Sequence, residues 1–345
     1  MDAKTYIRLT LLMVGLTQGL SLHPAWADTF TVTKFTDEYD GKCDKDCSLR
    51  DAIQEANKSA QPSVIKLEAG TYRQSIQGED NKNQSGDWDV SGNILLQGAG
   101  PEKTMIHLGG NNRAFEVLPN ASLSLEGLTL TGGHSNYGGA IRNRGTLTLK
   151  NCALVENVAD ISGGAIYNDK AGRLTVMNTS FQKNVASQGN GGAIEEAGQG
   201  AEVTNSIFTQ NRAMKGGCLD FVQGATLLSI ISGSENSAVE QGGCLWTGGS
   251  KEVTIKEISV SNNKAPVGKD CLGILVNIGR KIDIGEPNGC QILTSKQPTK
   301  SPATPPAKPA TPKKVRSQQQ AGTKITQPKT TVDKNKSRAG SREKR

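Results

Sequence analysis

The stretch that decides the fold is Gly138-Gly139-Ala140-Ile141, together with four later segments of the same form. Each has two glycines, a small residue and a bulky apolar residue. The later segments are Gly163-Gly164-Ala165-Ile166, Gly191-Gly192-Ala193-Ile194, Gly216-Gly217-Cys218-Leu219 and Gly242-Gly243-Cys244-Leu245. A nearly fixed period of roughly 26 residues is typical of a solenoid built from stacked repeats.

A second marker has nearly the same period. It is an asparagine that is followed two positions later by alanine, and it occurs as Asn157, Asn184, Asn211, Asn236 and Asn263. An asparagine at a recurrent turn suits left-handed backbone geometry, and stacked amides can hydrogen-bond from coil to coil.

Apolar residues precede each asparagine at fixed offsets, as in Leu147, Leu149, Cys152 and Leu154. Two pairs of alternating residues separated by an odd step predict two short strands with a bend between them. Each repeat is too short to bury its own apolar face, whereas stacked repeats pair every strand with the next. The sequence therefore predicts an all-β, single-stranded parallel β-helix.

The frame extends toward the N-terminus and has weak points. Ala114-Phe115 precedes Ala140-Ile141 by one period, and Asp89-Val90 precedes it by two, so we expect coils from about Ser63 to Cys290. Small or polar residues at inward positions predict thinner coils at Ala201, Ser206, Thr226 and Gly233.

A short capping helix is expected before the first coil, within a cap spanning 28–62. Cys47 to Ala56 is amphipathic, with Ser48 as its N-cap and Asp51 near the first-turn amides. Such a helix covers the unpaired strand edges of an open terminal coil.

These residues resemble known bacterial proteins. Cys47-Ser48-Leu49-Arg50-Asp51-Ala52 is similar to the N-terminal motif of the CSLREA family of secreted proteins, with Asp51 in place of glutamate. The repeats resemble polymorphic outer-membrane adhesins in their GGAI marker and in an FxxN marker at Phe181 and Phe208. The resemblance covers about Thr31 to Cys271 and implies a right-handed, pectin-lyase-like β-helix at a cell surface, with no common reaction.

The segment 1–27 has the form of an export signal. Lys4 and Arg8 precede the apolar run Leu9 to Leu22, and Ala25-Trp26-Ala27 is a small-x-small cleavage site. No later segment is predicted to cross a membrane as a helix. We therefore expect a bacterial protein that is secreted, periplasmic or held at the cell surface.

Seven cysteines suit an oxidising compartment, and an odd number leaves one unpaired. Cys218, Cys244 and Cys271 follow the period, so neighbours stack within disulfide reach. The expected pairs are Cys43 with Cys47, Cys218 with Cys244, and Cys271 with Cys290. Cys152 is expected to be a buried thiol, and no metal site is predicted because no histidine or CxxC pair accompanies the stacked cysteines.

Charge divides the chain into a body and a tail. Of the total of +7, residues 291–345 carry +12 and residues 1–27 carry +1, which leaves −6 for the body. The tail is rich in proline and lysine and poor in large apolar residues, so we expect it to be disordered. It is either a solvated tether or an anchor to an anionic envelope component, and specific nucleic-acid recognition is disfavoured because aromatic residues are not interleaved with the charges.

A candidate binding stripe follows the bulky marker residue by one position. Its members are Glu116, Arg142, Tyr167, Glu195, Asp220 and Trp246. If the marker residues point inward, these six point outward in one vertical row. The row is either an ordinary solvated face or a site where aromatic rings, arginine and carboxylates hold a sugar chain.

Catalysis would need more specific groups. Glu195 and Asp220 on adjacent coils, about 5 Å apart, suit a retaining glycosidase. A lyase needs a base such as Arg142 beside carboxylates holding Ca²⁺, and no dense acidic cluster is predicted near it. Asp87 and Asp89 could share a cation or simply be exposed loop residues, and His134 lacks a predicted triad partner.

The leading hypothesis is an exported, non-enzymatic β-helix without a cofactor that binds a polysaccharide or another cell-surface component as an adhesin or envelope protein. The alternatives are a polysaccharide lyase, with Ca²⁺, or a glycoside hydrolase acting along the same stripe, and a structural spacer anchored by its tail.

Overall fold

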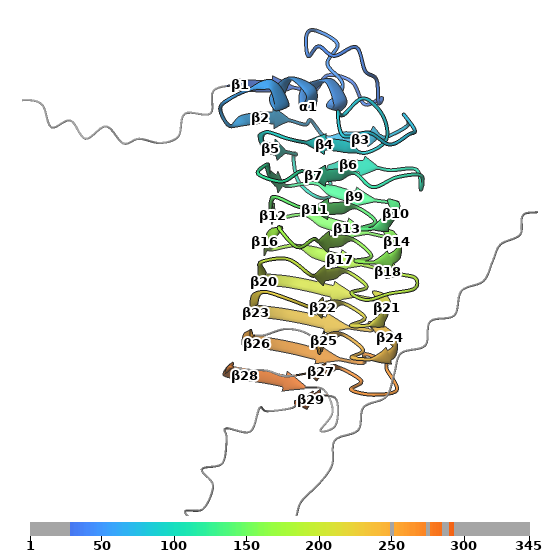
Figure 1. Ribbon diagram of the computed structural model, residues 1–345, viewed down its shortest axis with the longest axis vertical. Coiled ribbons are helices and arrows are strands. Elements are labelled where there is room, and N and C mark those ends of the chain that lie inside the picture. Colours follow the sequence, from blue (N-terminus) through green and yellow to red (C-terminus); the bar gives the residue numbers. More distant parts are fainter. Residues whose placement is uncertain (1–27, 249–251, 274–276, 285–289, 293–345) are drawn as a thin grey trace, which may run out of the picture. The chain divides into compact units, whose positions relative to one another are not determined.

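The computed structural model describes residues 28–248, 252–273, 277–284 and 290–292. Within these ranges the protein is a parallel β-helix with one short helix at its N-terminal end (Figure 1). The predicted export signal lies outside the described residues. So does the predicted basic tail, except for Gln291 and Ile292, which belong to strand β29.

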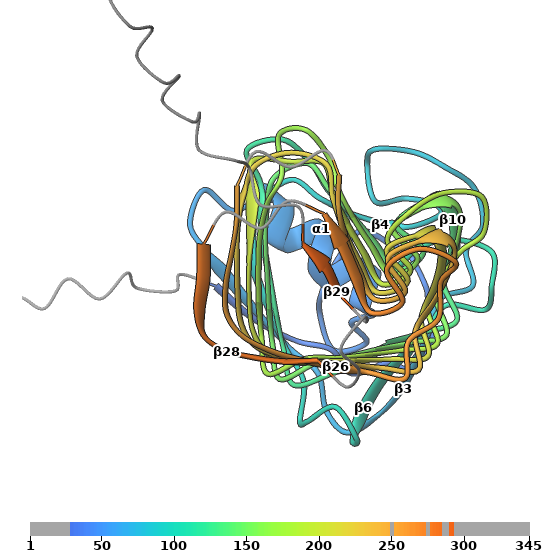
Figure 2. The same cartoon turned by 90° about the horizontal axis from the view of Figure 1, so that it is seen from below.

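Three parallel sheets run along the axis, and successive coils contribute successive strands (Figures 1 and 2). The 15-stranded sheet contains two series of short strands, here called its two limbs. Its four remaining strands are longer, and the first of them pairs with both limbs. Its first limb is β1 (Asp28–Thr31), β2 (Ser63–Lys66), β5 (Asn93–Gln97), β8 (Ser122–Glu126), β12 (Thr146–Lys150) and β16 (Arg173–Met177). Its second limb is β3 (Gly70–Arg73), β6 (Thr104–His107), β9 (Thr129–Thr131), β13 (Ala153–Val155) and β17 (Ser180–Gln182). The longer strands are β20 (Gly200–Thr209), β23 (Ala225–Ser234), β26 (Glu252–Ser261) and β28 (Asn277–Ile284).

The other two sheets complete each coil. The nine-stranded sheet consists of β4 (Trp88–Val90), β7 (Phe115–Val117), β11 (Ile141–Asn143), β15 (Ile166–Asn168), β19 (Ile194–Glu196), β22 (Leu219–Phe221), β25 (Leu245–Thr247), β27 (Cys271–Gly273) and β29 (Cys290–Ile292). The five-stranded sheet consists of β10 (His134–Tyr137), β14 (Val158–Ser162), β18 (Val185–Ala186), β21 (Arg212–Lys215) and β24 (Ser237–Gln241).

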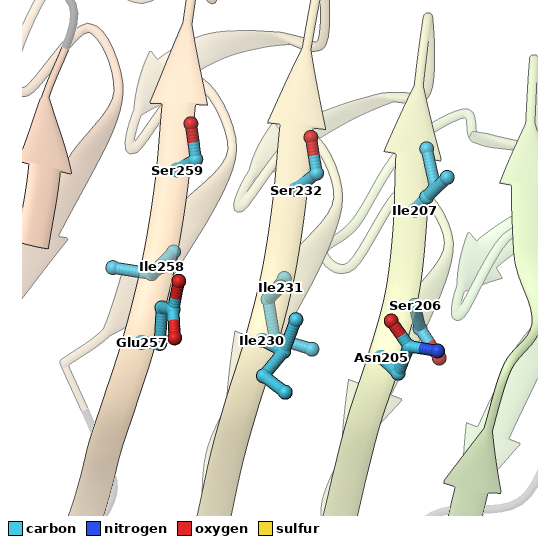
Figure 3. Close-up of a pocket in the computed structure, with 9 residues that line it drawn as sticks. All are labelled: Asn205, Ser206, Ile207, Ile230, Ile231, Ser232, Glu257, Ile258 and Ser259. Atoms are coloured by element: carbon cyan, nitrogen blue, oxygen red, sulfur yellow. The ribbon is translucent and has the colours of Figure 1, made fainter. Parts of the chain in front are cut away.

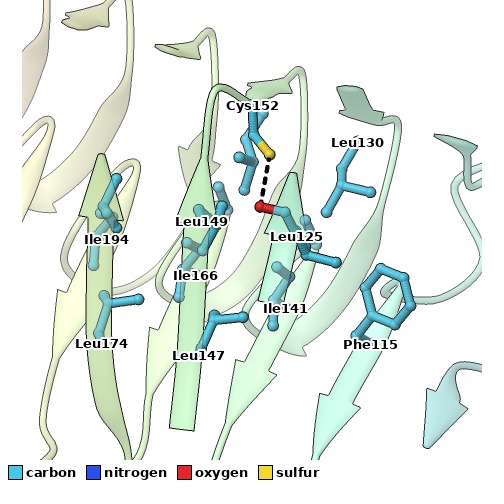
Figure 4. Close-up of a cluster of buried hydrophobic side chains, with 14 of the residues drawn as sticks. Phe115, Leu125, Leu130, Ile141, Leu147, Leu149, Cys152, Ile166, Leu174 and Ile194 are labelled. Carbon is cyan, nitrogen blue, oxygen red and sulfur yellow. Dashed lines mark hydrogen bonds between the residues drawn. The ribbon is translucent and has the colours of Figure 1, made fainter. Parts of the chain in front are cut away.

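The core is one continuous stack of apolar side chains inside the coils. In register, Leu147 lies beside Leu174 and Leu123, and Ile141 lies beside Phe115 and Ile166 (Figure 4). These neighbours confirm the predicted inward positions. Cys152 is buried in the same interior as a free thiol, with its Sγ 3.4 Å from the Leu125 carbonyl oxygen, and burial raises its pKa to about 11 (Figure 4).

The recurrent asparagines form a buried ladder. Each side-chain amide donates to the side-chain oxygen of the next, at 2.9–3.0 Å from Asn157 to Asn263, and Asn263 donates to Asp270 at 2.7 Å. The same oxygens accept the backbone N–H of the preceding asparagine. The predicted coil-to-coil amide bonds are therefore confirmed. The left-handed residue, however, is the one before each asparagine, such as Glu156 or Lys183, which frees the asparagine side chain to point inward.

The structure explains why both positions of the repeat marker are glycine. The first is in the left-handed region, with φ of 63° at Gly191. The second allows the next coil to approach, because a Cβ on Gly192 would lie 2.0 Å from the carbonyl oxygen of Gly217. The marker therefore fixes a tight turn between the five-stranded and nine-stranded sheets.

The N-terminal cap has the predicted helix. Helix α1 (Leu49–Lys58) begins after Ser48, whose hydroxyl accepts the backbone N–H of Asp51 at 3.1 Å. Arg50 is fully buried, pairs with Asp37 at 2.8 Å, and donates to the carbonyl oxygen of Gly86 at 2.8 Å. The helix is thus joined to the first coil by the arginine of the CSLRDA segment.

Two cysteine pairs are confirmed: Cys43–Cys47 and Cys218–Cys244. Gly233 leaves room for the second disulfide, since a Cβ there would lie 2.5 Å from the Cys244 sulfur. The predicted equivalence of Cys271 with Cys244 is wrong by one residue, because Cys271 is in register with Leu245. Cys271 is itself disulfide-bonded, and its register partner on β29 is Cys290, as the third predicted pairing requires.

One bend in the coils has an isoleucine, Ile230, in a left-handed conformation that usually favours glycine or asparagine. The residue at the bend between the two limbs is left-handed in successive coils. It is asparagine at positions 151, 178 and 205, but Ile230 in the next coil, where φ is 58°. A β-branched residue is strained in this region. Ile230 is also 51% exposed. It lies level with Asn205 of the neighbouring coil, in a hollow that Ile207 also lines (Figure 3).

Replacing Ile230 with asparagine is therefore expected to stabilise the protein by about 1 kcal/mol, because asparagine tolerates a positive φ and can extend the Asn178–Asn205 amide pair. Thermal or urea unfolding of Ile230→Asn would measure this. Ile207→Asn is the matched control, because Ile207 is 52% exposed but is not in the left-handed region. Equal stabilisation by both changes would show that exposure, not backbone strain, is responsible.

Candidate functional site

The predicted stripe is an in-register ladder on the nine-stranded sheet. Each member is paired with the next in adjoining strands; the order is Glu116, Arg142, Tyr167, Glu195, Asp220 and Trp246. The ladder does not form an open solvated face. Glu116, Glu195 and Asp220 are buried, and the other three are half-buried.

The ladder continues one coil toward the N-terminus, to Asp89. The spacing predicts Asp89-Val90 opposite Ala114-Phe115, and this alignment is wrong by two residues. Strand β4 pairs Trp88 with Phe115 and Asp89 with Glu116. The physical reason is that Trp88 takes the bulky inward position, 1% exposed, with its ring 5.5 Å from that of Phe115.

The ladder is buried because the chain folds inward between the nine-stranded and five-stranded sheets (Figure 2). The residue just before each glycine pair faces the ladder residue of the following coil. The rings of Tyr137 and Tyr167 lie 4.8 Å apart, and the Lys215 ammonium lies 4.9 Å from the Trp246 ring. Ser162 approaches Glu195 in the same way, and Asn190 approaches Asp220. We call this fold between the sheets the crease.

The middle of the crease holds two stacked acids that are closed to solvent. Asp220 is fully buried, and neither of its oxygens has a hydrogen bond of good geometry. Burial, and then the charge of Glu195, raises the pKa of Asp220 well above its usual value. Burial raises the pKa of Glu195 to about 7. These acids are adjacent as predicted, but a sugar would reach Asp220 only if the crease opened.

The N-terminal end of the crease is open. A polar groove of about 480 Å³ lies over β10 and the loop before β7, and its lining includes Asn112, Tyr137 and Asp160. It adjoins a recess of about 380 Å³. Both are lined by Glu79, Arg113 and Arg142. We call the two together the N-terminal groove.

Arginines and carboxylates alternate on the floor of this groove. Arg113 pairs with Asp87 at 2.8 Å. Glu116 contacts Arg144 directly and lies 3.8 Å from Arg142, which pairs with Asp169 at 2.7 Å. Three of the ladder's residues, Asp89, Glu116 and Arg142, thus meet a cluster of charges from neighbouring loops.

The floor also contains the dense acidic cluster that the sequence does not predict near Arg142. One carboxylate oxygen from each of Asp87, Asp89 and Glu116 lies within 4.8 Å of the others, and all three residues are buried. Burial raises the pKa of Asp87 to about 6 and, together with the charge of Asp87, that of Asp89 to about 8. The expectation that no such cluster accompanies Arg142 is therefore wrong, because the register places Asp89 beside Glu116, and Glu116 beside Arg142.

His134 has a carboxylate partner. It lies in strand β10 rather than in a loop, and its Nε2 is 2.9 Å from an oxygen of Asp160 on the next coil. Both side chains are exposed at the rim of the N-terminal groove. The pair adds a hydrogen-bonding edge to the groove.

Comparison with protein-family models, with curated proteins and with solved structures finds no match. Among the described residues, no helix is long and apolar enough to cross a membrane. The disulfides are compatible with an extracellular or periplasmic location.

The buried acids predict how stability depends on pH. Glu196, the residue after Glu195 in β19, is also fully buried. Burial raises the pKa values of Glu195 and Glu196 to about 7 and that of Asp220 well above its usual value, so the folded state holds protons that the unfolded state has released. The free energy of unfolding should therefore fall as pH rises from about 4.5 to 7. Thermal unfolding in EDTA should give a lower Tm at pH 8 than at pH 5.

The Glu195→Gln and Asp220→Asn changes should flatten this dependence, because a neutral amide has no proton to lose. Glu202→Gln, at an exposed position on β20, is the control and should leave the slope unchanged. A Tm that rises between pH 5 and pH 8 would contradict the assignment of protonated, buried acids.

Proposed function

We propose that this is an exported, non-enzymatic β-helix protein that binds a polysaccharide, or another hydroxyl-rich cell-surface component, in its N-terminal groove. The observation that carries the proposal is the groove itself, where guanidinium, carboxylate, amide and hydroxyl groups stand side by side on a rigid coil stack. The CSLRDA segment, which resembles the motif of secreted bacterial proteins, and the disulfides support export. The GGAI repeats, which are similar to those of surface adhesins, support a role at the cell envelope.

The balance of charge favours a hydroxyl-rich ligand over a polyanion. Five carboxylates and three arginines line the groove, so it has no net positive charge to attract an anion; the carboxylates are Glu79, Asp80, Asp87, Glu116 and Asp160. Alternating donors and acceptors suit vicinal hydroxyls, which both donate and accept. The half-buried Tyr137–Tyr167 pair gives the adjoining crease an aromatic surface on which a sugar ring can pack.

Glycan binding can be tested on the mature chain with an array of neutral, amino and acidic glycans, followed by titration of each hit. Arg142→Ala should weaken binding at least about tenfold, the effect of losing one charge-assisted hydrogen bond. Arg173→Ala, on the first limb of the 15-stranded sheet, is the matched control and should bind normally.

Two further results would decide between versions of the site. Trp246→Ala should leave binding unchanged, because Trp246 packs against Lys215 at the far end of the crease. An equal loss with Trp246→Ala would place the ligand along the whole ladder instead. If no glycan in the array binds, the proposed function fails.

A polysaccharide lyase is the second candidate, favoured by one observation: Arg142 lies 3.8 Å from Glu116, a member of the acidic cluster. In a lyase the arginine would have to release its own proton to solvent before it could take one from the sugar. Burial, which lowers the pKa of Arg142, is outweighed by the bond to Asp169 and the charge of Glu116, which raise it and oppose that release. A cation on the carboxylates would stabilise the charge that develops on the sugar. Incubation with acidic polysaccharides, with and without Ca²⁺, would release new chain ends if the protein is a lyase and none if it only binds.

The basic tail has a separate proposed role. Its formal charge of +12 favours retention on an anionic envelope component. Deleting residues 293–345 would then release the protein from the surface in low salt without changing glycan affinity.

A further inference from the structure

The acidic cluster lies where the N-terminal cap meets the first coils. Asp87 directly precedes β4, Asp89 is the middle residue of β4, and Glu116 comes from β7 on the next coil. They are 3%, 1% and 7% exposed, respectively. Three carboxylates held this close in a buried place repel one another unless a proton or another positive charge is supplied.

Two of the three carboxylates have that charge from the protein. Asp87 is paired with Arg113, and Glu116 with Arg144. Among the described residues, no lysine, arginine or histidine forms an ion pair with Asp89. The oxygen Oδ2 of Asp89 accepts the backbone N–H of Asn83 at 3.1 Å, and the other oxygen, Oδ1, is buried without a hydrogen-bond partner.

A second, independent feature points to a ligand at the same place. Asn83 is fully buried in the loop before β4, in the left-handed conformation with φ of 60°. Its backbone N–H contacts Asp89, and its side-chain amide donates to the Arg50 carbonyl oxygen at 2.8 Å. Its side-chain oxygen is buried with no partner. Burying an oxygen without a donor is costly. Asn83 is bonded to Asp89 through its backbone, and each of these two residues has a buried side-chain oxygen without a partner, which indicates a missing positive group.

We propose that Asp87, Asp89 and Glu116, together with the side-chain oxygen of Asn83, bind a hard divalent cation. Carboxylate and amide oxygens without thiol or imidazole are the ligands of Ca²⁺, Mg²⁺ and Mn²⁺. The ion supplies the positive counter-charge that no side chain gives to Asp89. It also gives a partner to the two buried oxygens that have none, Oδ1 of Asn83 and Oδ1 of Asp89.

The cation also has a structural consequence. Asn83 bonds to Arg50 of α1, and Arg50 in turn donates to the carbonyl oxygen of Gly86 in the loop before β4. An ion held by Asn83, β4 and β7 therefore ties the cap to the first two coils. This inference does not rest on glycan binding, although the site lies at the floor of the same groove.

The test is thermal unfolding of the mature chain after EDTA treatment and dialysis, with CaCl₂, MgCl₂ or MnCl₂ added up to about 10 mM, above the dissociation constants of weak extracellular sites. At least one ion should raise the Tm by about 2 °C or more. Asp89→Asn should abolish the shift while raising the Tm of the ion-free protein, because asparagine has neither a charge to compensate nor a proton to take up on folding. Glu195→Gln, a buried carboxylate in the crease, should keep the full shift.

Equilibrium dialysis gives a readout that does not depend on stability. The wild-type chain should bind about one ion, and Asn83→Gly, which keeps the left-handed backbone but removes the side-chain oxygen, should bind it at least about tenfold more weakly. The proposal is overturned if none of the three ions binds, or if Asp89→Asn binds as well as the wild type. None of these measurements uses a glycan, so failure here leaves the proposed function standing and failure of glycan binding leaves the cation site standing.

Discussion

The interaction on which the rest of the structure depends is the vertical pairing of identical positions on successive coils. Parallel strands satisfy their backbone groups only with the coils above and below, so each coil must keep the length and bend of its neighbours. The asparagine ladder enforces this at the turn between the second limb and the five-stranded sheet. Each amide there donates to its neighbour's oxygen and to a backbone carbonyl, for example Asn184 to Asn211 and to Leu154. A coil of the wrong length would leave a buried amide and a buried carbonyl unpaired, at a cost of about 1–3 kcal/mol for each group.

The same pairing creates the crease. The first glycine of each pair is left-handed, and the second leaves room for the backbone of the next coil. The chain therefore turns tightly between the two sheets, at the equivalent position in each of these coils. The outward ladder of the nine-stranded sheet is thereby brought against the residues that precede the glycine pairs. Carboxyl groups that would be solvated on an open face, those of Glu195 and Asp220, are buried in the middle of the crease and have raised pKa values. The charged residues of the ladder adjoin an open groove near its N-terminal end, where the coils carry longer loops.

Much of the fold could be predicted because its signals are local and repeated. The glycine pairs, the asparagines and the alternating apolar residues each specify a turn, a ladder or a strand, and Ser48 and Asp51 specify the helix start. The candidate site was less predictable, because its partners depend on register. A two-residue error at Trp88 hides Asp89 from the ladder, and a one-residue step shifts Cys271 onto Leu245. The residues that fill the crease, such as Tyr137 and Lys215, do carry a signal, since each comes directly before a glycine pair. That signal becomes meaningful only once the turn is known to be tight enough to bring two sheets face to face.

The polar groove and the acidic cluster lie at the N-terminal coils because the sequence there departs from the regular repeat. Inside a regular stack, a residue has the same neighbours in every coil, and stacked charges repel unless they alternate or are protonated, as at Glu195 and Asp220. At the first coils, Trp88 replaces the usual aliphatic marker, Asp87 replaces the small residue before it, and the loop preceding β4 supplies Asn83. Loops of this kind can place groups of opposite charge beside a ladder that could not supply them itself. Arg50 then couples these groups to the cap, so the part of the rod that seals its end also shapes its most polar surface.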